Sequence, residues 1–236
     1  MAWVNRVLEV LPQAELRLLE PQLERVDLVR NTILVEEGTN AQHVFLPVNC
    51  ILSVMTAMRD GSLVESRTIG REGGFGLLHA LGARLSFERL EVQVSGEAWR
   101  LPIGALEARA TESPEVRREL VRHAQATLVQ SAQATACNAL HAAEQRLCRW
   151  LLLTQDRLGA DLLPLTQEHL SIMLGVQRTT VTGLASALQA KGLISYSRGK
   201  IRILDRPSLE RCACECYEAV TRGAERMLAD PVSYGA

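Results

Sequence analysis

Five polar side chains crowd the start of one predicted helix, and their types suit contact with the edges of DNA bases. They are Gln177, Arg178, Thr179, Thr180 and Thr182. An arginine can make two parallel hydrogen bonds to guanine in the major groove. Threonine is a mediocre helix former, so helix stability does not explain why three threonines lie so close together. The composition of this segment therefore predicts a contact surface.

Two basic residues mark a second predicted contact. The segment "LISYSRGKIRIL", residues 193–204, consists of two β-prone runs joined at Arg198-Gly199, and it carries Arg198 and Lys200 at its tip. Cationic side chains in such a place can meet phosphate groups, which carry no base identity. The segment therefore predicts a basic hairpin, or wing, beside the helix.

The segment around these residues matches the helix-turn-helix sequence pattern. That pattern requires apolar, small or glycine residues at seven positions, and all seven are filled. These positions hold Leu170, Ser171, Leu174, Gly175, Val176, Val181 and Leu184. Thr166 is a suitable N-cap for the first helix and a further predicted DNA contact, Gly175 can adopt the left-handed turn, and Gly192 can end the second helix. In such motifs the N-terminal end of the second helix meets base edges. Two ordinary core helices and a β-ribbon are the alternative, which leaves the seven matches and the basic hairpin unexplained.

Composition and charge are consistent with this interpretation. The 236 residues, 47% hydrophobic, can form one large domain or two modest ones. The start "MAWVNRVLEVLP" lacks the apolar run of a signal peptide, and no segment approaches the roughly 18 apolar residues of a membrane span, so we expect a cytoplasmic protein with no membrane partner. The net charge is −4 over residues 1–112 but +3 over residues 161–204. The basic surplus surrounds the predicted contact residues.

The first half of the chain predicts strands. From about Ile33 to Leu101, short β-prone runs alternate with turn signals, and Asp60-Gly61 between two runs is a strong hairpin signal. Small helices are expected before them. This order predicts a β-sandwich or β-roll, and hence an α+β chain.

A long helix is expected next. Ser113-Pro114-Glu115 combines an N-cap, a proline at the first helical position and an early carboxylate, and no Gly or Pro follows until Gly159. A bend near residues 138–141 and a second helix over residues 142–158 lead to the last domain. A mild seam falls at heptad a and d positions, which could join two copies of the chain or pack on its own domain. Its members are Val121, Ala124, Leu128, Ser131, Thr135 and Asn138.

The cysteines and histidines give no clear cofactor site. The six cysteines follow no disulfide framework and would stay reduced in the expected compartment. In "CACECY", a helix would place Cys212 and Cys216 on one face and Cys214 about half a turn away. That geometry suits no single metal without unwinding, so we predict no metal site and favour a structural role over redox sensing or metal binding. His79 and His123 lack the sequence context of haem ligands. No nucleophile–base pair or paired-carboxylate motif appears, so we expect no enzyme and identify no cofactor.

The order of these elements resembles the Crp/Fnr family of transcription regulators. The segment "LTQEHLSIMLGVQRTTVTGLASALQAKGLI" carries the resemblance, together with "HAAEQRLCRWLL" and "RGKIRILDRPSLE". The resemblance covers nearly the whole chain. It implies a cyclic-nucleotide-binding-like β-roll that senses a signal, a long helix that joins two copies, and a winged helix on double-stranded DNA. A second copy of the chain and RNA polymerase are the protein partners that it implies.

The departures from the family concern both sites. Family recognition helices often read Arg-Glu-Thr-Val-x-Arg, but here Thr179 replaces the Glu and Gly183 the last Arg, so we expect a different DNA site. A cyclic-nucleotide member has a Gly-Glu pair and then an Arg-Ser or Arg-Thr pair. These align with Gly74-Phe75 and with Glu88-Arg89, so the resemblance predicts no response to cyclic AMP. The "GREGGFG" turn could present N–H groups to an anion or be only a tight connection. The candidate effector residues are Arg71, Gly73, Gly74, Phe75 and Arg89.

Two functions are consistent with these patterns. The first is a dimeric, sequence-specific DNA-binding regulator with an unidentified effector, divided into a sensor domain (1–112), a dimerisation helix (113–140) and a winged-helix domain (141–236). The second is a ligand-binding module that contacts another protein through its winged helix. The charges of Arg178, Arg198 and Lys200 favour the first, because a protein-binding wing has no need of cations that meet phosphates.

Overall fold

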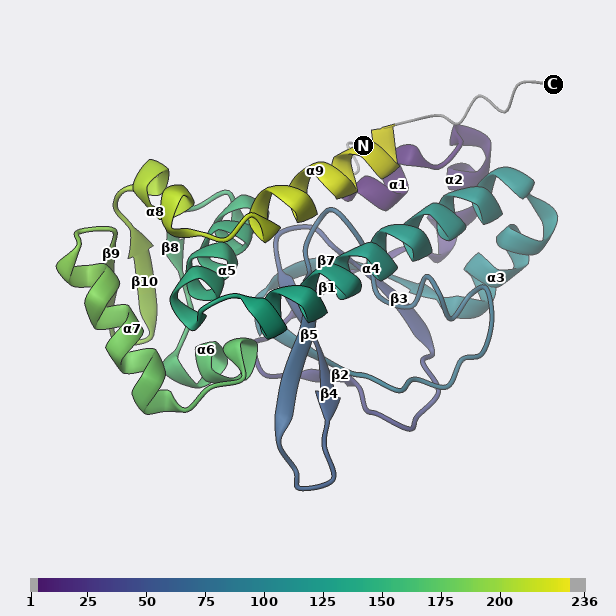
Figure 1. The fold of residues 1–236 in the computed structure, drawn as a ribbon. Coiled ribbons are helices and arrows are strands. Elements are labelled where there is room, and N and C mark those ends of the chain that lie inside the picture. Colours follow the sequence, from purple (N-terminus) through teal and green to yellow (C-terminus); the bar gives the residue numbers. More distant parts are fainter. Residues whose placement is uncertain (1–3, 230–236) are drawn as a thin grey trace.

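The computed structural model describes residues 4–229, which form a β-roll, a long central helix and a C-terminal helical domain with a small sheet (Figure 1). The chain begins with helices α1 (Arg6–Val10) and α2 (Gln13–Leu19) and the 3-10 turn η1 (Glu20–Gln22). Seven strands follow: β1 (Glu24–Leu28), β2 (Ile33–Val35), β3 (His43–Pro47), β4 (Ile51–Ala57), β5 (Leu63–Ile69), β6 (Arg89–Val94) and β7 (Gly96–Pro102).

The seven strands form two antiparallel sheets with the orders β1-β7-β3 and β2-β6-β4-β5. Apolar side chains from both sheets meet in one core; Leu46 and Leu101 come from the first sheet, and Leu52 and Leu90 from the second. The expected α+β class with an N-terminal roll of strands is therefore confirmed.

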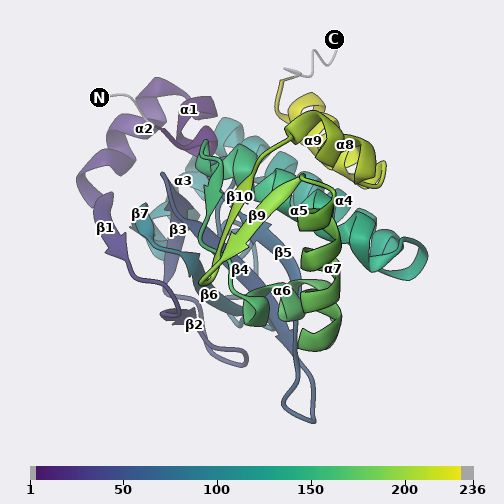
Figure 2. The same ribbon diagram turned by 90° about the vertical axis from the view of Figure 1, so that its left-hand side faces the viewer.

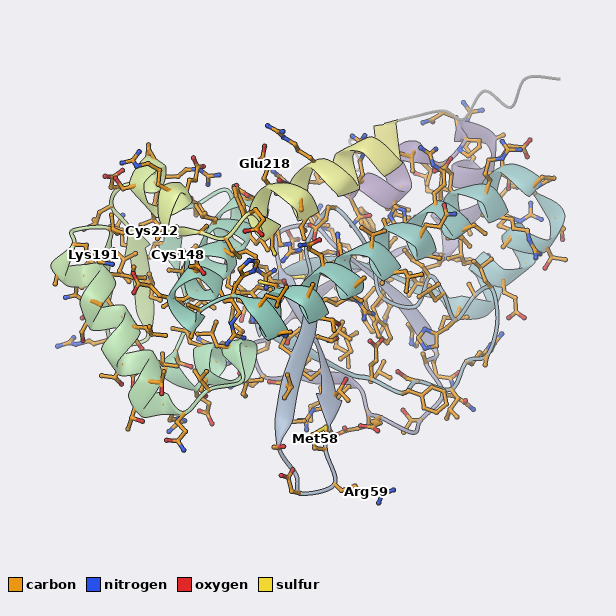
Figure 3. The ribbon with its side chains drawn as sticks, in the orientation of Figure 1. Met58, Arg59, Cys148, Lys191, Cys212 and Glu218 are labelled. Carbon is orange, nitrogen blue, oxygen red and sulfur yellow. The ribbon has the colours of Figure 1, made fainter. Side chains whose placement is uncertain are left out.

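The hairpin predicted at Asp60-Gly61 is also confirmed. It joins β4 to β5, Gly61 has φ of 84°, and the Asp60 carboxylate accepts a hydrogen bond from the Ser62 N–H at 2.9 Å. Its tip projects from the roll, with Met58 and Arg59 on it (Figure 3).

The central helix begins where the sequence predicts. Helix α3 (Ile103–Glu112) ends at Ser113, whose hydroxyl then caps α4 (Pro114–Leu140) by accepting a hydrogen bond from the Val116 N–H. One face of α4 is buried and holds Val116, Leu120, His123, Ala126 and Cys137.

The C-terminal domain forms a second core around α5 (Ala143–Leu158), after a break at His141 and Ala142. Its other elements are β8 (Leu162–Leu163), α6 (Gln167–Leu174), α7 (Arg178–Ala190), β9 (Ile194–Ser197), β10 (Lys200–Ile203), α8 (Arg206–Cys212) and α9 (Cys216–Ala229). The sheet order is β8-β10-β9. Helix α9 runs back along α4 (Figure 1). No helix within residues 4–229 is long and apolar enough to cross a membrane.

Five elements lie outside the sequence predictions: β1, α3, β8, α8 and α9. Strand β1 pairs with β7 along the edge of the first sheet, and α3 connects the roll to α4. Helix α9 packs against α4 and so brings the end of the described chain back to the central helix.

Candidate nucleic-acid interface

Helices α6 and α7 form the predicted helix-turn-helix, and local chemistry fixes both of its ends. The Thr166 hydroxyl caps α6 by accepting a hydrogen bond from the His169 N–H at 3.3 Å, and Gly175 ends that helix with φ of 62°. Gly192, with φ of 71°, follows α7. All three sequence predictions for these positions are confirmed.

The five polar residues at the start of α7 are exposed, while the opposite side of the helix is anchored in the core. Val181, Ala185 and Leu188 are buried. Gln177, Arg178, Thr179, Thr180 and Thr182 all face solvent. The Thr182 hydroxyl donates to the Arg178 carbonyl of its own helix, and the Gln177 side chain makes no capping bond to α7. When no side chain caps the N-terminus of a helix, its first backbone N–H groups can donate hydrogen bonds to phosphate oxygens.

The predicted wing is a two-residue hairpin between β9 and β10. Arg198 and Gly199 have φ of 48° and 74°, the left-handed values that a type I′ turn needs at both central positions. Lys200 pairs with Ser197 directly after the turn. Both basic side chains are exposed, and Gly199 approaches the Thr166 side chain closely. Figure 2 looks onto this domain, with the β9–β10 hairpin beside α6 and α7.

Arg178, among the predicted base-reading residues, forms an ion pair within its own chain. Its Nη2 lies 2.9 Å from the Glu168 carboxylate on α6, and the two side chains are 60% and 63% exposed. Exposed ion pairs of this kind contribute about 0–1 kcal/mol. Arg178 can therefore leave Glu168 for a base edge at a small cost in free energy.

The candidate effector residues lie on the Gly-rich turn after β5 and on β6, and the structure does not bring all of them together. Gly73, Gly74 and Phe75 line two adjoining cavities of about 30 and 40 Å³ between the roll and α4. Arg71 and Arg89 do not line either cavity. The Arg89 side chain instead pairs with Glu91, at 3.3 Å.

The Gly-rich turn is a tight connection. The Phe75 N–H donates to the Phe45 carbonyl at 2.9 Å, and the Gly73 N–H to the Gly70 carbonyl at 3.2 Å, so these N–H groups are occupied. A Cβ at Gly74 would clash with Leu46, which explains the glycine there by close packing. Of the two interpretations of this turn, the geometry favours the connection over an anion cradle.

Polar groups that were not among the predicted effector residues surround the cavities. Arg67 and Glu88 form a two-bond ion pair at one wall, with distances of 2.5 and 3.0 Å. His123 projects from α4 between both cavities, is 7% exposed, and has no hydrogen-bond partner for either ring nitrogen among the described residues. Burial lowers the pKa of His123 to about 4, with a smaller effect in the same direction from Arg122. His123 is therefore neutral at pH 7 and can accept or donate a hydrogen bond in the cavity.

Side chains on α5 and α6 dock the C-terminal domain on the roll. On α5, Arg157 Nε donates to the Glu72 carboxylate at 2.7 Å, and the same guanidinium contacts the Thr68 hydroxyl. Glu72 and Thr68 both line the larger cavity. On α6, His169 Nδ1 lies 2.9 Å from the Arg30 guanidinium of the roll.

The predicted dimer seam lies on the exposed side of α4. Val121 is 42% and Leu128 71% exposed, Thr135 is exposed, and Ala124 and Ser131 are half-buried. By the 100° step of a helix, Leu128 lies opposite Cys137, which faces α9. The side of α4 that carries the seam is thus a different side from the one that packs against its own chain.

The cysteine prediction assumed a helix that the structure interrupts. Helix α8 ends at Cys212 and α9 begins at Cys216, so the intervening residues turn Cys214 toward Cys216. There they meet Cys137 and His141 from the end of α4, and the four ligand atoms lie within 4.8 Å of one another. The continuous helix on which the sequence inference was conditioned is therefore absent, and Cys214 and Cys216 share a cluster with Cys137 and His141 that does not include Cys212. The missed signal was Cys137-x-x-x-His141, a four-residue spacing that places both side chains on one helix face.

The fold and this surface define a winged helix-turn-helix regulator with an N-terminal β-roll, and comparisons with known proteins agree. Residues 145–212 match the Crp-like helix-turn-helix domain. The chain is 25% identical over 211 residues to the transcriptional regulatory protein btr of Bordetella pertussis, covering 80% of this chain and 84% of that protein.

Two solved structures share the fold. A transcriptional regulator of the Crp/Fnr family from Eubacterium rectale superimposes with a TM-score of 0.69 at 20% identity, covering 86% of this chain and 94% of that one. FixK2 from Bradyrhizobium japonicum gives 0.70 at 18% identity, covering 81% and 98%. Residues 145–212 therefore form a Crp-like helix-turn-helix domain, the chain has the fold of the Crp/Fnr regulators, and the relative named above is a transcriptional regulator.

Proposed function

We propose that the chain acts as a homodimer that binds specific sequences of double-stranded DNA in the cytoplasm, under the control of a signal at the β-roll. The proposed division is a sensor domain (1–112), a dimerisation helix (113–140) and a DNA-binding domain (141–236). One observation carries the DNA partner: an exposed polar helix start on α7 beside a type I′ hairpin that carries Arg198 and Lys200.

The two parts of this surface have different tasks. Arg178 and the threonines at the start of α7 would face base edges in the major groove. Arg198 and Lys200 would meet phosphates on the flanking backbone, where they displace counterions whatever the sequence. The alternative, a winged helix that contacts another protein, does not need this pairing of base-reading and phosphate-binding groups.

Two substitutions separate the tasks. We expect Arg178→Ala to lose about 1–3 kcal/mol of discrimination at one base pair, because the bidentate contact to guanine is removed. Lys200→Ala should weaken binding to all sequences alike and reduce the slope of log affinity against log salt by about one. The measurement is binding to a selected operator and its single-base variants at several salt concentrations.

Arg59→Ala is the matched control, because Arg59 lies on the tip of the β4–β5 hairpin and not on this surface (Figure 3). It should leave affinity, discrimination and salt slope unchanged. Equal losses for Arg178→Ala and Lys200→Ala on every sequence, with the salt slope unchanged, would instead support the protein-contact alternative.

The sensor part of the proposal rests on the cavities under α4. His123 offers a buried, unpartnered imidazole, and Glu72 and Thr68 join the larger cavity to Arg157 of the DNA-binding domain. A signal molecule that contacts these groups would act on the position of α5. The cavities are far below the roughly 300–1,000 Å³ of typical small-molecule pockets, so the signal is small or the roll must open.

We expect no specific response to cyclic AMP. Phe75, which stands where a cyclic-nucleotide member has a glutamate, is buried and forms a backbone β-bridge with Phe45. The Glu88 carboxylate, which forms an ion pair with Arg67, would repel the phosphate of the nucleotide. Calorimetric titration with cyclic AMP should give the same small heats as titration with AMP. Micromolar binding of cyclic AMP with one site per chain would contradict the prediction.

A further inference from the structure

The strongest unassigned feature is the cluster of Cys137, His141, Cys214 and Cys216, which joins the end of α4 to the start of α9. The Cys137 and Cys214 sulfurs are 3.5 Å apart, and the Cys216 sulfur is 3.4 Å from His141 Nδ1. All three cysteines are buried and the histidine is partly buried. Four ligand atoms of these types converge on one point between segments about 75 residues apart in sequence.

We propose that these four residues bind one zinc ion and thereby fasten the segment that follows the wing to the central helix. A tetrahedral zinc ion with Zn–S of about 2.3 Å and Zn–N of about 2.0–2.1 Å needs ligand atoms separated by about 3.5–3.8 Å. The two separations of 3.5 and 3.4 Å are close to this requirement. Three cysteines and one histidine are a common ligand set of structural zinc sites.

The size of the cluster distinguishes zinc from an iron–sulfur centre. The cysteine ligands of such a centre are divided among two or more iron atoms that inorganic sulfide bridges, so some of the ligand sulfurs must lie farther apart than around a single ion. Donor atoms that all lie within 4.8 Å of one another leave room for a single ion only.

The surroundings of the cluster are those of a metal site. His141 Nε2 lies 3.1 Å from the Glu215 carboxylate, which leaves Nδ1 on the side of Cys216. Histidine ligands of zinc commonly donate their other N–H to a carboxylate in this way, which fixes the ring and its tautomer. The Gln133 amide donates to the Cys216 sulfur at 2.9 Å, a contact that would stabilise a thiolate.

A buried cation nearby would balance the charge. Three thiolates and a neutral imidazole around Zn²⁺ carry a net charge of −1. Arg149 is 2% exposed, and two of its guanidinium nitrogens have no hydrogen-bond partner in the described part of the chain. Burial is the largest influence on Cys137 and Cys214 and raises the pKa of both thiols, and the charge of Arg149 acts in the opposite direction, more strongly at Cys137 than at Cys214. The guanidinium thus supplies a counter-charge where an anionic site would need one.

The first test is metal content and coordination of the whole chain. Protein prepared without metal and then titrated with Zn²⁺ should retain one zinc per chain after gel filtration. With Co²⁺ in place of zinc, the absorption should show sulfur-to-cobalt charge transfer and the intense visible bands of a tetrahedral ion. Cys137→Ser and Cys214→Ser should lose both, whereas Glu215→Gln should weaken zinc affinity about 10–100-fold through the histidine.

Two variants keep the test decisive if a serine variant does not fold. His141→Cys should still bind one ion, with stronger charge-transfer absorption from a fourth sulfur. Cys212→Ser is the matched control: this cysteine is only two residues from Cys214, but it lies near Cys148 and Lys191 (Figure 3) and is not part of the cluster. It should bind zinc as the unaltered chain does.

The second test is the fastening itself. Removing zinc should increase hydrogen exchange of the backbone amides in α9 and at the end of α4, and leave the β-roll unchanged. The proposal is overturned if the chain takes up no zinc, if uptake survives Cys137→Ser and Cys214→Ser, or if mass spectrometry finds a Cys137–Cys214 disulfide in place of a bound ion. None of these results depends on DNA binding, so the regulator proposal is tested separately.

Discussion

The double substitution Val121→Asp and Leu128→Asp should convert a dimer into a monomer. In a dimer through the exposed seam of α4, these positions would bring four like charges into an apolar contact, at several kcal/mol even after relaxation. That corresponds to a roughly 100-fold or greater rise in the dimer dissociation constant. Because both side chains are exposed in the single chain, the fold itself should be preserved. Sedimentation equilibrium over a range of concentrations measures the change.

A matched pair of substitutions controls for added charge. Leu18→Asp with Val29→Asp also places two carboxylates on exposed apolar positions, but on α2 and on the turn after β1. This variant should sediment as the unaltered chain does. If the α4 variant sediments as a dimer with the original affinity, the seam is misplaced, and the exposed apolar side of α4 serves another purpose.

Replacing Glu65 should remove a pronounced loss of stability with rising pH. This carboxyl group on β5 lies inside the roll, where Ser53 and the Gln93 amide donate hydrogen bonds to it. Burial raises the pKa of Glu65 to about 8 from 4.5, partly offset by Ser53, Arg157 and Arg149. The folded chain therefore keeps this proton up to about pH 8, whereas the unfolded chain releases it above pH 4.5.

The sign of the effect follows from that difference. The stability associated with Glu65 is complete below pH 4.5 and declines as the pH rises to about 8, by up to about 1.36 kcal/mol per pH unit. Between about pH 5 and pH 8 the difference in unfolding free energy between Glu65→Gln and the unaltered chain should shift by up to roughly 4 kcal/mol in favour of the variant. Denaturant unfolding at each pH gives the measurement.

A second variant separates ionisation from packing. Glu65→Leu removes the same proton site but also the hydrogen bonds, so its baseline stability should differ from that of Glu65→Gln while its pH dependence is the same. If both variants keep the slope of the unaltered chain, the Glu65 carboxyl does not titrate over this pH range.

Local signals account for what the sequence could predict. The cap at Ser113, the glycines at 61, 175 and 192 and the Arg198-Gly199 turn each act within a few residues. The seven helix-turn-helix positions also lie within one short segment, so they were sufficient to predict which face of α7 is polar and exposed. Strand β1 was missed because "ERVDL" has no clear alternation, and its pairing with β7 joins residues about 70 apart.

The cysteine cluster and the cavities depend on long-range packing. Nothing near Cys137 indicates that α9 will return to it, and a continuous helix over residues 206–229 would have kept Cys214 away. Similarly, the contacts of Arg157 with Glu72 and Thr68 join α5 to β5 and the turn after it, across more than 80 residues. Sequence spacing predicts which residues share an element, but not which elements meet.

The Glu72 carboxylate has two roles: it lines the larger cavity, and it accepts a hydrogen bond from Arg157 on helix α5 of the C-terminal domain. A signal molecule that draws Glu72 away would release α5, and one that reinforces the pair would retain it. Linkage then works in both directions: if the signal changes the affinity for DNA by some factor, DNA must change the affinity for the signal by the same factor. The operator would therefore act as an effector of the sensor, and a chain already on its DNA would respond at a different signal concentration from a free one.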